Sequence, residues 1–243
     1  MNIQQNQGYF DVTRQQADSL TFSRTFLSNV FSWMFLGLLS TAGTAYIFSG
    51  SAQLMSLLIS ETGMTGLGWV VMLAPFGFVL LLSFGFNKLS SAAMIILFVI
   101  YAVLMGMSLS FIFLAYSLGS IASTFAITAG MFGAMALLGY TTKTDLTKFG
   151  SILIMALVGV IIASFVNLLI LKSSMFDYFI SLMGVLIFTG LTAYDVQKLK
   201  RIGSGVEDGL ESTRKLTIMG ALTLYLDFIN LFLFLLRFLG NRK

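Results

Sequence analysis

Hydrophobic residues are gathered in seven long runs, and short polar linkers separate them. A helix needs about 20 apolar residues to cross ~30 Å of hydrocarbon, and each run has about this length. A transmembrane β-barrel would instead show alternating segments of about ten residues. The pattern predicts an all-α integral membrane protein with seven transmembrane helices, near residues 27–49, 67–86, 92–116, 119–140, 150–171, 176–197 and 216–240.

The runs also divide the chain. A cleaved signal would place its apolar region near the start of the polar N-terminal segment. The first apolar run begins near Leu27 and has full membrane length, so we interpret it as a retained span. The predicted parts are a polar N-terminal tail (1–26), a seven-helix transmembrane domain (27–240) and a basic C-terminal tail (241–243).

Two local patterns refine the spans. The sole proline, Pro75, falls inside the second run and predicts a kink or a break in that helix. In the fourth run, Ala129 with Gly133 and Gly130 with Ala134 have the small-xxx-small spacing that suits close helix packing.

Composition excludes several classes of protein. The chain is 57% hydrophobic and 10% charged, whereas soluble domains carry roughly 25% charged residues. It contains no cysteine and no histidine, so disulfides, thiol chemistry, His-zinc hydrolysis and a Ser-His protease in its usual form are all excluded. No basic-aromatic patch indicates a nucleic-acid partner.

The net charge of +4 reports on orientation. With the N-terminus inside, ten Lys/Arg residues lie on the inner side. Four lie on the outer side: Lys172, Arg237, Arg242 and Lys243. Because inner loops collect positive charge, a cytoplasmic N-terminus is favoured. A re-entrant last segment would shift the count to thirteen against one, but the 25 residues of this run are ample to cross.

Two aspartates stand out in apolar sequence: Asp195 in GVLIFTGLTAYDVQKLK and Asp227 in LTLYLDFINLFLFLL. A charged carboxylate in a bilayer costs at least ~2.5–3.5 kcal/mol, so such residues usually serve a function. The alternatives are that Asp195 pairs locally with Lys198 at the headgroups, and that Asp227 only hydrogen-bonds neighbouring helices. Thr223 and Asn230 share the helical face of Asp227, and with Tyr194 they are candidates for a supporting polar face.

The two aspartates can reach one depth if the first turns of the last helix lie at or below the inner interface. Two carboxylates in low dielectric cannot both ionise cheaply, so the pair would titrate as a unit and share a proton. The protonated pair could hold two helices together, whereas the ionised pair would repel or bind a cation. Two carboxylates would give Ca²⁺ a weak site completed by waters.

Other polar residues have simpler interpretations. Lys88, in the inner loop after the second run, is either a counter-ion to the pair or an ordinary positive-inside lysine. The acidic residues Glu207, Asp208 and Glu211 are interpreted as a solvated loop, and Asn167 as a helix-bridging hydrogen-bonding residue.

The segments FTGLTAYDVQKLK and LTLYLDFINLFLFLLRFLG, with YAVLMGMSLSFIF in the third run, resemble the Bax inhibitor-1 family from about residue 20 onwards. The resemblance implies a seven-helix fold whose last helix is central and surrounded by the other six. It implies a pH-sensitive Ca²⁺ leak channel, with Asp195 and Asp227 as the pH-sensing pair. A basic residue contacts the pair in that family, and Lys88 occupies its position, with a point charge in place of arginine's fork.

The resemblance also implies a multi-pass protein of a bacterial inner membrane. Its expected partners are lipid, protons and Ca²⁺ as the permeant ion, without a cofactor. Bacterial members are linked to restraint of a membrane-bound AAA protease, so a membrane stress regulator that binds such a partner is the alternative function. An intramembrane aspartyl protease is a remote alternative. Tyr194-Asp195 fits it, but the GxGD motif is replaced by Leu224-Tyr225-Leu226-Asp227 and no proline follows Pro75. We therefore expect that the protein is not an enzyme.

Overall fold

The computed structural model describes residues 3–61, 63–206 and 209–243, and it describes residues 3–20 by their backbone alone. Seven of its helices are long and apolar enough to cross a membrane, which confirms the predicted all-α membrane fold. The helices are α1 (Ile3–Gly50), α3 (Gly66–Gly85), α4 (Ser91–Leu109), α6 (Leu118–Thr141), α7 (Thr147–Val166), α8 (Ser174–Gly203) and α9 (Glu211–Leu239). The membrane part of α1 begins at Thr21.

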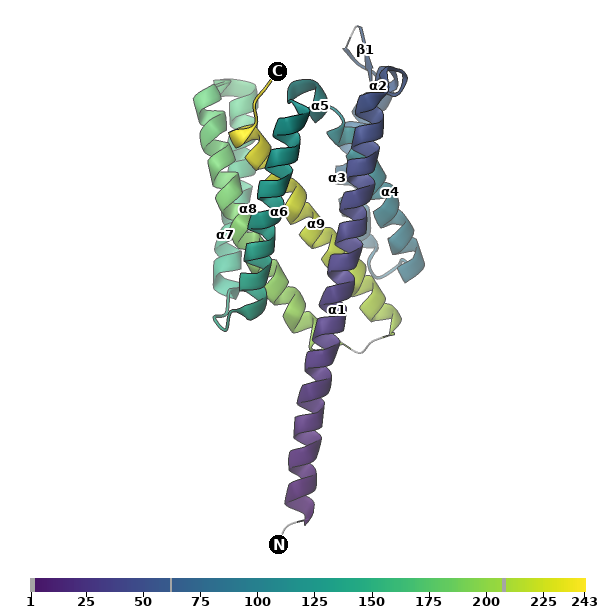
Figure 1. The fold of residues 1–243 in the computed structure, drawn as a ribbon, viewed down its shortest axis with the longest axis vertical. Coiled ribbons are helices and arrows are strands. Elements are labelled where there is room, and N and C mark those ends of the chain that lie inside the picture. Colours follow the sequence, from purple (N-terminus) through teal and green to yellow (C-terminus); the bar gives the residue numbers. More distant parts are fainter. Residues whose placement is uncertain (1–2, 62, 207–208) are drawn as a thin grey trace.

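Helix α9 lies between two groups of three helices and crosses the bundle obliquely (Figure 1). One group contains α1, α3 and α4, and the other contains α6, α7 and α8. In α9, 67% of the most apolar stretch is buried inside the protein, against 17% in the span that contains α7. The last helix is therefore central. Its extensive contacts are with α1, α4, α6 and α8, while α3 packs mainly on α4 and α7 on α8.

The last run crosses the whole bundle. α9 is continuous, and the tail after it docks beside the start of α6, at the end of the bundle opposite to the N-terminus (Figure 1). There the Asn241 N–H donates to the Ser120 hydroxyl over 3.0 Å, and Arg242 forms a β-bridge with Tyr116. A re-entrant last segment is therefore not what the chain forms.

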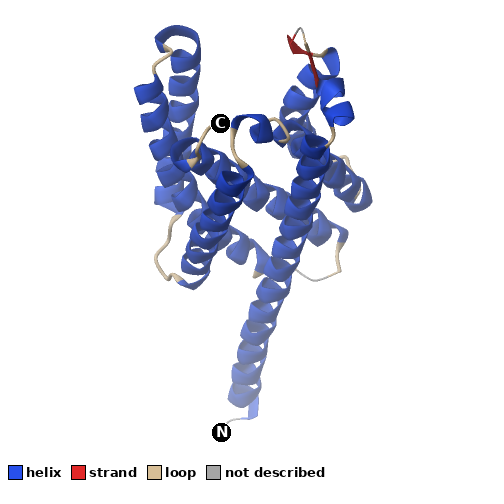
Figure 2. Ribbon diagram, turned by 45° about the horizontal axis from the view of Figure 1, so that its top comes forward, coloured by secondary structure: helices blue, strands red, loops and turns tan. Residues whose placement is uncertain are grey.

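Short elements occupy the helix connections: α2 (Ala52–Leu58), β1 (Ile59–Ser60), β2 (Gly63–Met64), α5 (Ile112–Ala115) and the π-helix η1 (Asn167–Leu171). Figure 2 shows the β1–β2 hairpin in red against the blue helices. Serine or threonine hydroxyls cap the first turns of five helices, because they accept N–H groups that have no partner within the helix. These caps are Ser51, Thr65, Ser90, Ser117 and Ser173.

The glycines show where helices approach most closely. A Cβ added at Gly130 or Gly133 would meet nothing within 4 Å, so this small-residue spacing does not make the predicted close helix contact. The tight crossing lies further along α6, where a Cβ at Gly139 would sit 2.8 Å from the backbone Cα of Ala193 on α8. Helix α3 continues through Pro75, so the proline does not end that helix.

Two polar residues of the connections bridge helices. The Asn167 amide donates to the Ser173 carbonyl and to the Asp177 carboxylate, and it joins the end of α7 to the start of α8 as predicted. Glu211 is not simply solvated, because its carboxylate accepts the N–H and the hydroxyl of Ser91 at 2.6 and 2.8 Å. This contact ties α9 to α4. Glu207 and Asp208 lie outside the described residues.

A buried tyrosine fixes α9 to the α1–α3–α4 group. The Tyr225 hydroxyl lies 2.7 Å from the Thr41 hydroxyl, which donates to the Ala102 carbonyl over 2.9 Å. Tyr101 packs edge-on against Tyr225 with ring centroids 5.5 Å apart. Among the described residues, the buried Tyr101 hydroxyl has no hydrogen-bond partner.

These two tyrosines should respond oppositely to loss of the hydroxyl. Tyr225→Phe should destabilise the protein by about 0.5–1.5 kcal/mol, because it removes an interhelical hydrogen bond. Tyr101→Phe should leave stability unchanged or raise it, because it removes an unpaired buried polar group. Thermal unfolding of the two variants in one detergent measures both effects. A larger loss of stability in Tyr101→Phe than in Tyr225→Phe would contradict this assignment.

Candidate functional site

The structure brings Asp195 of α8 and Asp227 of α9 together. Their carboxyl groups lie within hydrogen-bonding range of each other. Both side chains are buried, with 9% and 5% of their surfaces exposed. The Asp227 Oδ2 atom has no hydrogen-bond donor among the described residues. Two carboxyl groups can form a hydrogen bond with each other only when at least one of them carries a proton.

Helix α8 is held firmly on its other side. The Gln197 side chain donates to the Thr144 carbonyl over 2.7 Å and accepts the Leu146 N–H over 2.9 Å. The Lys200 ammonium donates to the Tyr140 carbonyl over 2.7 Å and lies over the Tyr140 ring. These bonds tie the end of α8 that follows Asp195 to the α6–α7 turn.

An ion pair completes this connection. Arg201 of α8 lies 3.2 Å from the Asp145 carboxylate, which also accepts the hydroxyl and the N–H of Thr147. The Thr147 hydroxyl, followed by its N–H and by Arg201, holds the pKa of Asp145 below its usual range. Helices α6, α7 and α8 are thus cross-linked to one another near the aspartates.

The candidate counter-ions lie at the surface. Lys198 is exposed, and its ammonium lies 5.9 Å from the centre of the Tyr194 ring. Lys88 is exposed in the turn after α3. In the described part of the chain, neither lysine forms an ion pair with Asp195 or Asp227. Lys198 still acts on Asp195 through electrostatic attraction at longer range, and the buried carboxyl group beside Asp195 is that of Asp227.

The supporting polar residues bond within their own helices. Thr223 donates to the Met219 carbonyl over 3.0 Å, and Asn230 to the Leu226 carbonyl over 2.8 Å. The Tyr194 ring packs against Gly150 of α7. These three residues flank the pair and contribute no hydrogen bond to it among the described residues.

The donor set fits a cation only weakly. No group of three or more Asp, Glu, His or Cys residues gathers in the described ranges. The pair alone offers up to four carboxylate oxygens, fewer than the six to eight ligands that Ca²⁺ usually takes. An ion at this position would keep part of its water shell, which suits passage better than storage.

Comparison with known proteins identifies the fold. The family model described as "Inhibitor of apoptosis-promoting Bax1" matches residues 23–243. The chain belongs to the Bax inhibitor-1 family. The chain is 48% identical over 221 residues to the inner membrane protein YbhL of Escherichia coli K12, covering 90% of this chain and 93% of YbhL.

Two further relatives are similar to this chain over nearly their whole length. A protein of Borreliella burgdorferi is 46% identical over 233 residues, covering 96% of this chain and 98% of its own. The protein RP147 of Rickettsia prowazekii is 47% identical over 220 residues, covering 90% of this chain and 91% of its own. The protein is thus an integral, multi-pass membrane protein in contact with lipid.

The tyrosine link and the α8 cross-link were not found by sequence reasoning. Tyr225 stands in the same LYLD segment as Asp227, so a polar hydroxyl deep in an apolar run was an available signal. The end of α8, by contrast, carries polar residues that are common at an inner membrane boundary: Gln197, Lys200 and Arg201. Their partners come from a turn more than 50 positions earlier in the chain, and no local pattern specifies that pairing.

Proposed function

We propose that this protein is a pH-sensitive Ca²⁺ leak channel whose gate is the pair of Asp195 and Asp227. The observation that carries the proposal is the contact between two buried carboxyl groups on adjacent membrane helices. Carboxyl groups inside a membrane usually mark an ion or proton pathway. A pair of carboxyl groups that shares a proton would make the contact between these two central helices sensitive to pH.

The gate works by separating α8 from α9. With a proton between them, the two carboxyl groups hold the helices together. When the pair is fully ionised, repulsion in a low-dielectric interior favours separation and the entry of water or a cation. Because α9 is linked to α1 through Tyr225 and α8 is linked to α6 and α7, the pair lies at the contact between the two helix groups.

Protons and Ca²⁺ compete for the same oxygens in this mechanism. Metal binding needs deprotonated carboxylates, so Ca²⁺ affinity falls as the proton concentration rises. The half-saturating Ca²⁺ concentration for flux should therefore increase as the pH falls. The N-terminus is proposed to be cytoplasmic, which places the helix ends nearest the aspartates, with most of the lysines and arginines, on the inner side.

Calcium flux into liposomes tests the proposal. Purified full-length protein in liposomes that contain a trapped Ca²⁺ indicator should pass Ca²⁺ faster than empty liposomes. The half-saturating Ca²⁺ concentration should rise between pH 8 and pH 6 on the basis of proton competition. Flux no faster than in empty liposomes at any pH, or flux with the same half-saturation throughout, would refute the channel.

A further inference from the structure

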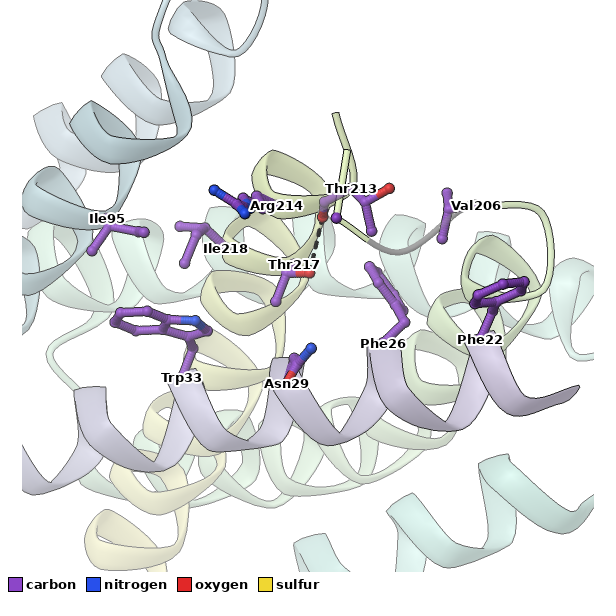
Figure 3. Close-up of a pocket in the computed structure, with 11 residues that line it drawn as sticks. Phe22, Phe26, Asn29, Trp33, Ile95, Val206, Thr213, Arg214, Thr217 and Ile218 are labelled. Carbon is purple, nitrogen blue, oxygen red and sulfur yellow. Dashed lines mark hydrogen bonds between the residues drawn. The ribbon is translucent and has the colours of Figure 1, made fainter. Parts of the chain in front are cut away.

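A separate cavity of about 550 Å³ opens where α1, α4 and α9 meet the α8–α9 connection. The cavity lies near Thr21, where the membrane span of α1 begins. Figure 3 shows the side chains of α1 lining one wall and those of α9 facing them. Ligand pockets usually measure about 300–1,000 Å³, so this cavity has room for a small organic group.

Three side chains with nitrogen donors line this cavity. They are the Arg214 guanidinium, the Asn29 amide and the Trp33 indole N–H. Among the described residues none of the three has a hydrogen-bond partner, and Arg214 and Asn29 are exposed to solvent while Trp33 is half-buried. Glu211, the nearest described acid in the chain, already accepts two hydrogen bonds from Ser91. Arg214 also interacts electrostatically with Glu211. A cation beside two neutral nitrogen donors still suits an anionic ligand rich in oxygen.

The cavity also has an apolar side. Trp33 lies with Ile95 of α4 and Ile218 of α9, while Phe26 and Phe22 line the wall towards the end of α1 (Figure 3). From Phe22 to Trp33 the wall extends about 16 Å along α1, at 1.5 Å per residue. An occupant would therefore meet both charge-binding and hydrocarbon surfaces, as an amphiphile requires.

Charge at this end of the bundle favours the same class of ligand. Arg24, Lys88, Lys215 and the basic residues of the α6–α7 turn lie at this end, together with the acids Asp145 and Glu211. The opposite end holds Lys172 and the C-terminal cations. Anionic lipid headgroups gather beside basic residues near the membrane surface. Tryptophan and arginine are also typical residues of the membrane interface.

From this cavity we propose that the protein binds an anionic phospholipid, with the phosphate on Arg214 and Asn29 and an acyl chain against Trp33 and Ile218. The site is separate from the aspartate pair and does not depend on the proposed leak. A headgroup held there would bridge α1 and α9, which hold the two walls of the cavity. The lipid would thereby stabilise the position of the central helix.

Quenching of Trp33 fluorescence measures this binding directly. The chain has two tryptophans, and Trp69→Phe leaves Trp33 as the sole reporter. The full-length variant is placed in phosphatidylcholine vesicles with a small fraction of lipid carrying brominated acyl chains. Brominated phosphatidylglycerol should quench Trp33 several-fold more than the same fraction of brominated phosphatidylcholine. Equal quenching by the two lipids would overturn the site.

Matched variants separate the cavity from general surface charge. Arg214→Gln should weaken phosphatidylglycerol binding about tenfold, as expected for one charge-assisted hydrogen bond. Asn29→Asp should weaken it from the opposite wall by placing a negative charge there. Arg24→Gln removes an exposed arginine on α1 outside this cavity and should preserve binding. An equal loss in Arg24→Gln, or no loss in both cavity variants, would contradict the proposal.

Free phosphate distinguishes the lipid from a soluble anion. Inorganic phosphate, added at constant ionic strength, should leave quenching by brominated phosphatidylglycerol unchanged, because it lacks the acyl chain that contacts Trp33. If phosphate restores Trp33 fluorescence, the occupant is a soluble anion and the lipid assignment is wrong.

Discussion

Asp227→Asn is expected to remove most of the pH dependence of Ca²⁺ flux. Asparagine keeps the shape of the side chain and can donate a hydrogen bond to Asp195, so it imitates the protonated carboxyl group without being able to ionise. The pair then loses both its coupled titration and one of its two ionised ligands. The half-saturating Ca²⁺ concentration should rise about tenfold or more, equivalent to ~1.4 kcal/mol. Liposome flux at several pH values measures both changes.

Asp195→Asn provides the reciprocal test, because the two residues act as one site. It should flatten the pH response as Asp227→Asn does, and the double variant should add little to either single change. Glu61→Gln, which neutralises an exposed carboxylate between β1 and β2, should leave the response intact. A pH response that survives in both single Asp→Asn variants would remove the pair from the gate.

Gly139→Ala is expected to destabilise the protein by about 1–3 kcal/mol. The added methyl group would overlap the Ala193 carbonyl and lie 2.8 Å from both its carbonyl carbon and its Cα. A backbone segment cannot rotate away as a flexible side chain can, so α6 and α8 must move apart. Ala193 is two residues before Asp195, and the change should therefore alter flux as well as stability. The temperature at which half of the monodisperse protein is lost on heating measures the stability.

Gly130→Ala is the control on the same helix. Nothing lies within 4 Å of the added Cβ, and alanine favours helix over glycine. Its stability should equal or exceed that of the parent protein. Equal losses in the two variants would mean that α6 is sensitive to any added side chain, and not that it makes a specific close crossing at Gly139.

The sequence was sufficient for the spans, because a bilayer demands long apolar runs whatever the tertiary structure. It also identified Asp195 and Asp227, since carboxylates in hydrocarbon are costly. Whether the two side chains meet depended on the angle of α9. The oblique path of α9 (Figure 1) reduces the depth difference that simple counting along the helices gives.

Contacts between segments that are distant in the sequence were harder to predict. The small-xxx-small spacing at Gly130 and Gly133 predicted a close helix contact that the fold does not make. The orientation of a helix about its axis depends on all its neighbours, and the spacing alone does not specify it. The acid Glu211 looked like part of a solvated loop until the start of α4 was placed beside it. In both cases the local sequence was compatible with several environments, and the tertiary packing selected one.

The connection between α5 and α6 has a mechanical consequence. Only Tyr116 and Ser117 separate these helices, and the C-terminal tail docks against the same place. The α6–α8 group joins the remaining chain only here and through the segment after α8. Tyr225 holds α9 to the opposite group. Any separation of α6, α7 and α8 from the rest of the bundle is therefore restrained at Tyr116, and it must also break the hydrogen bond from the Ser23 hydroxyl of α1 to the Lys200 carbonyl of α8.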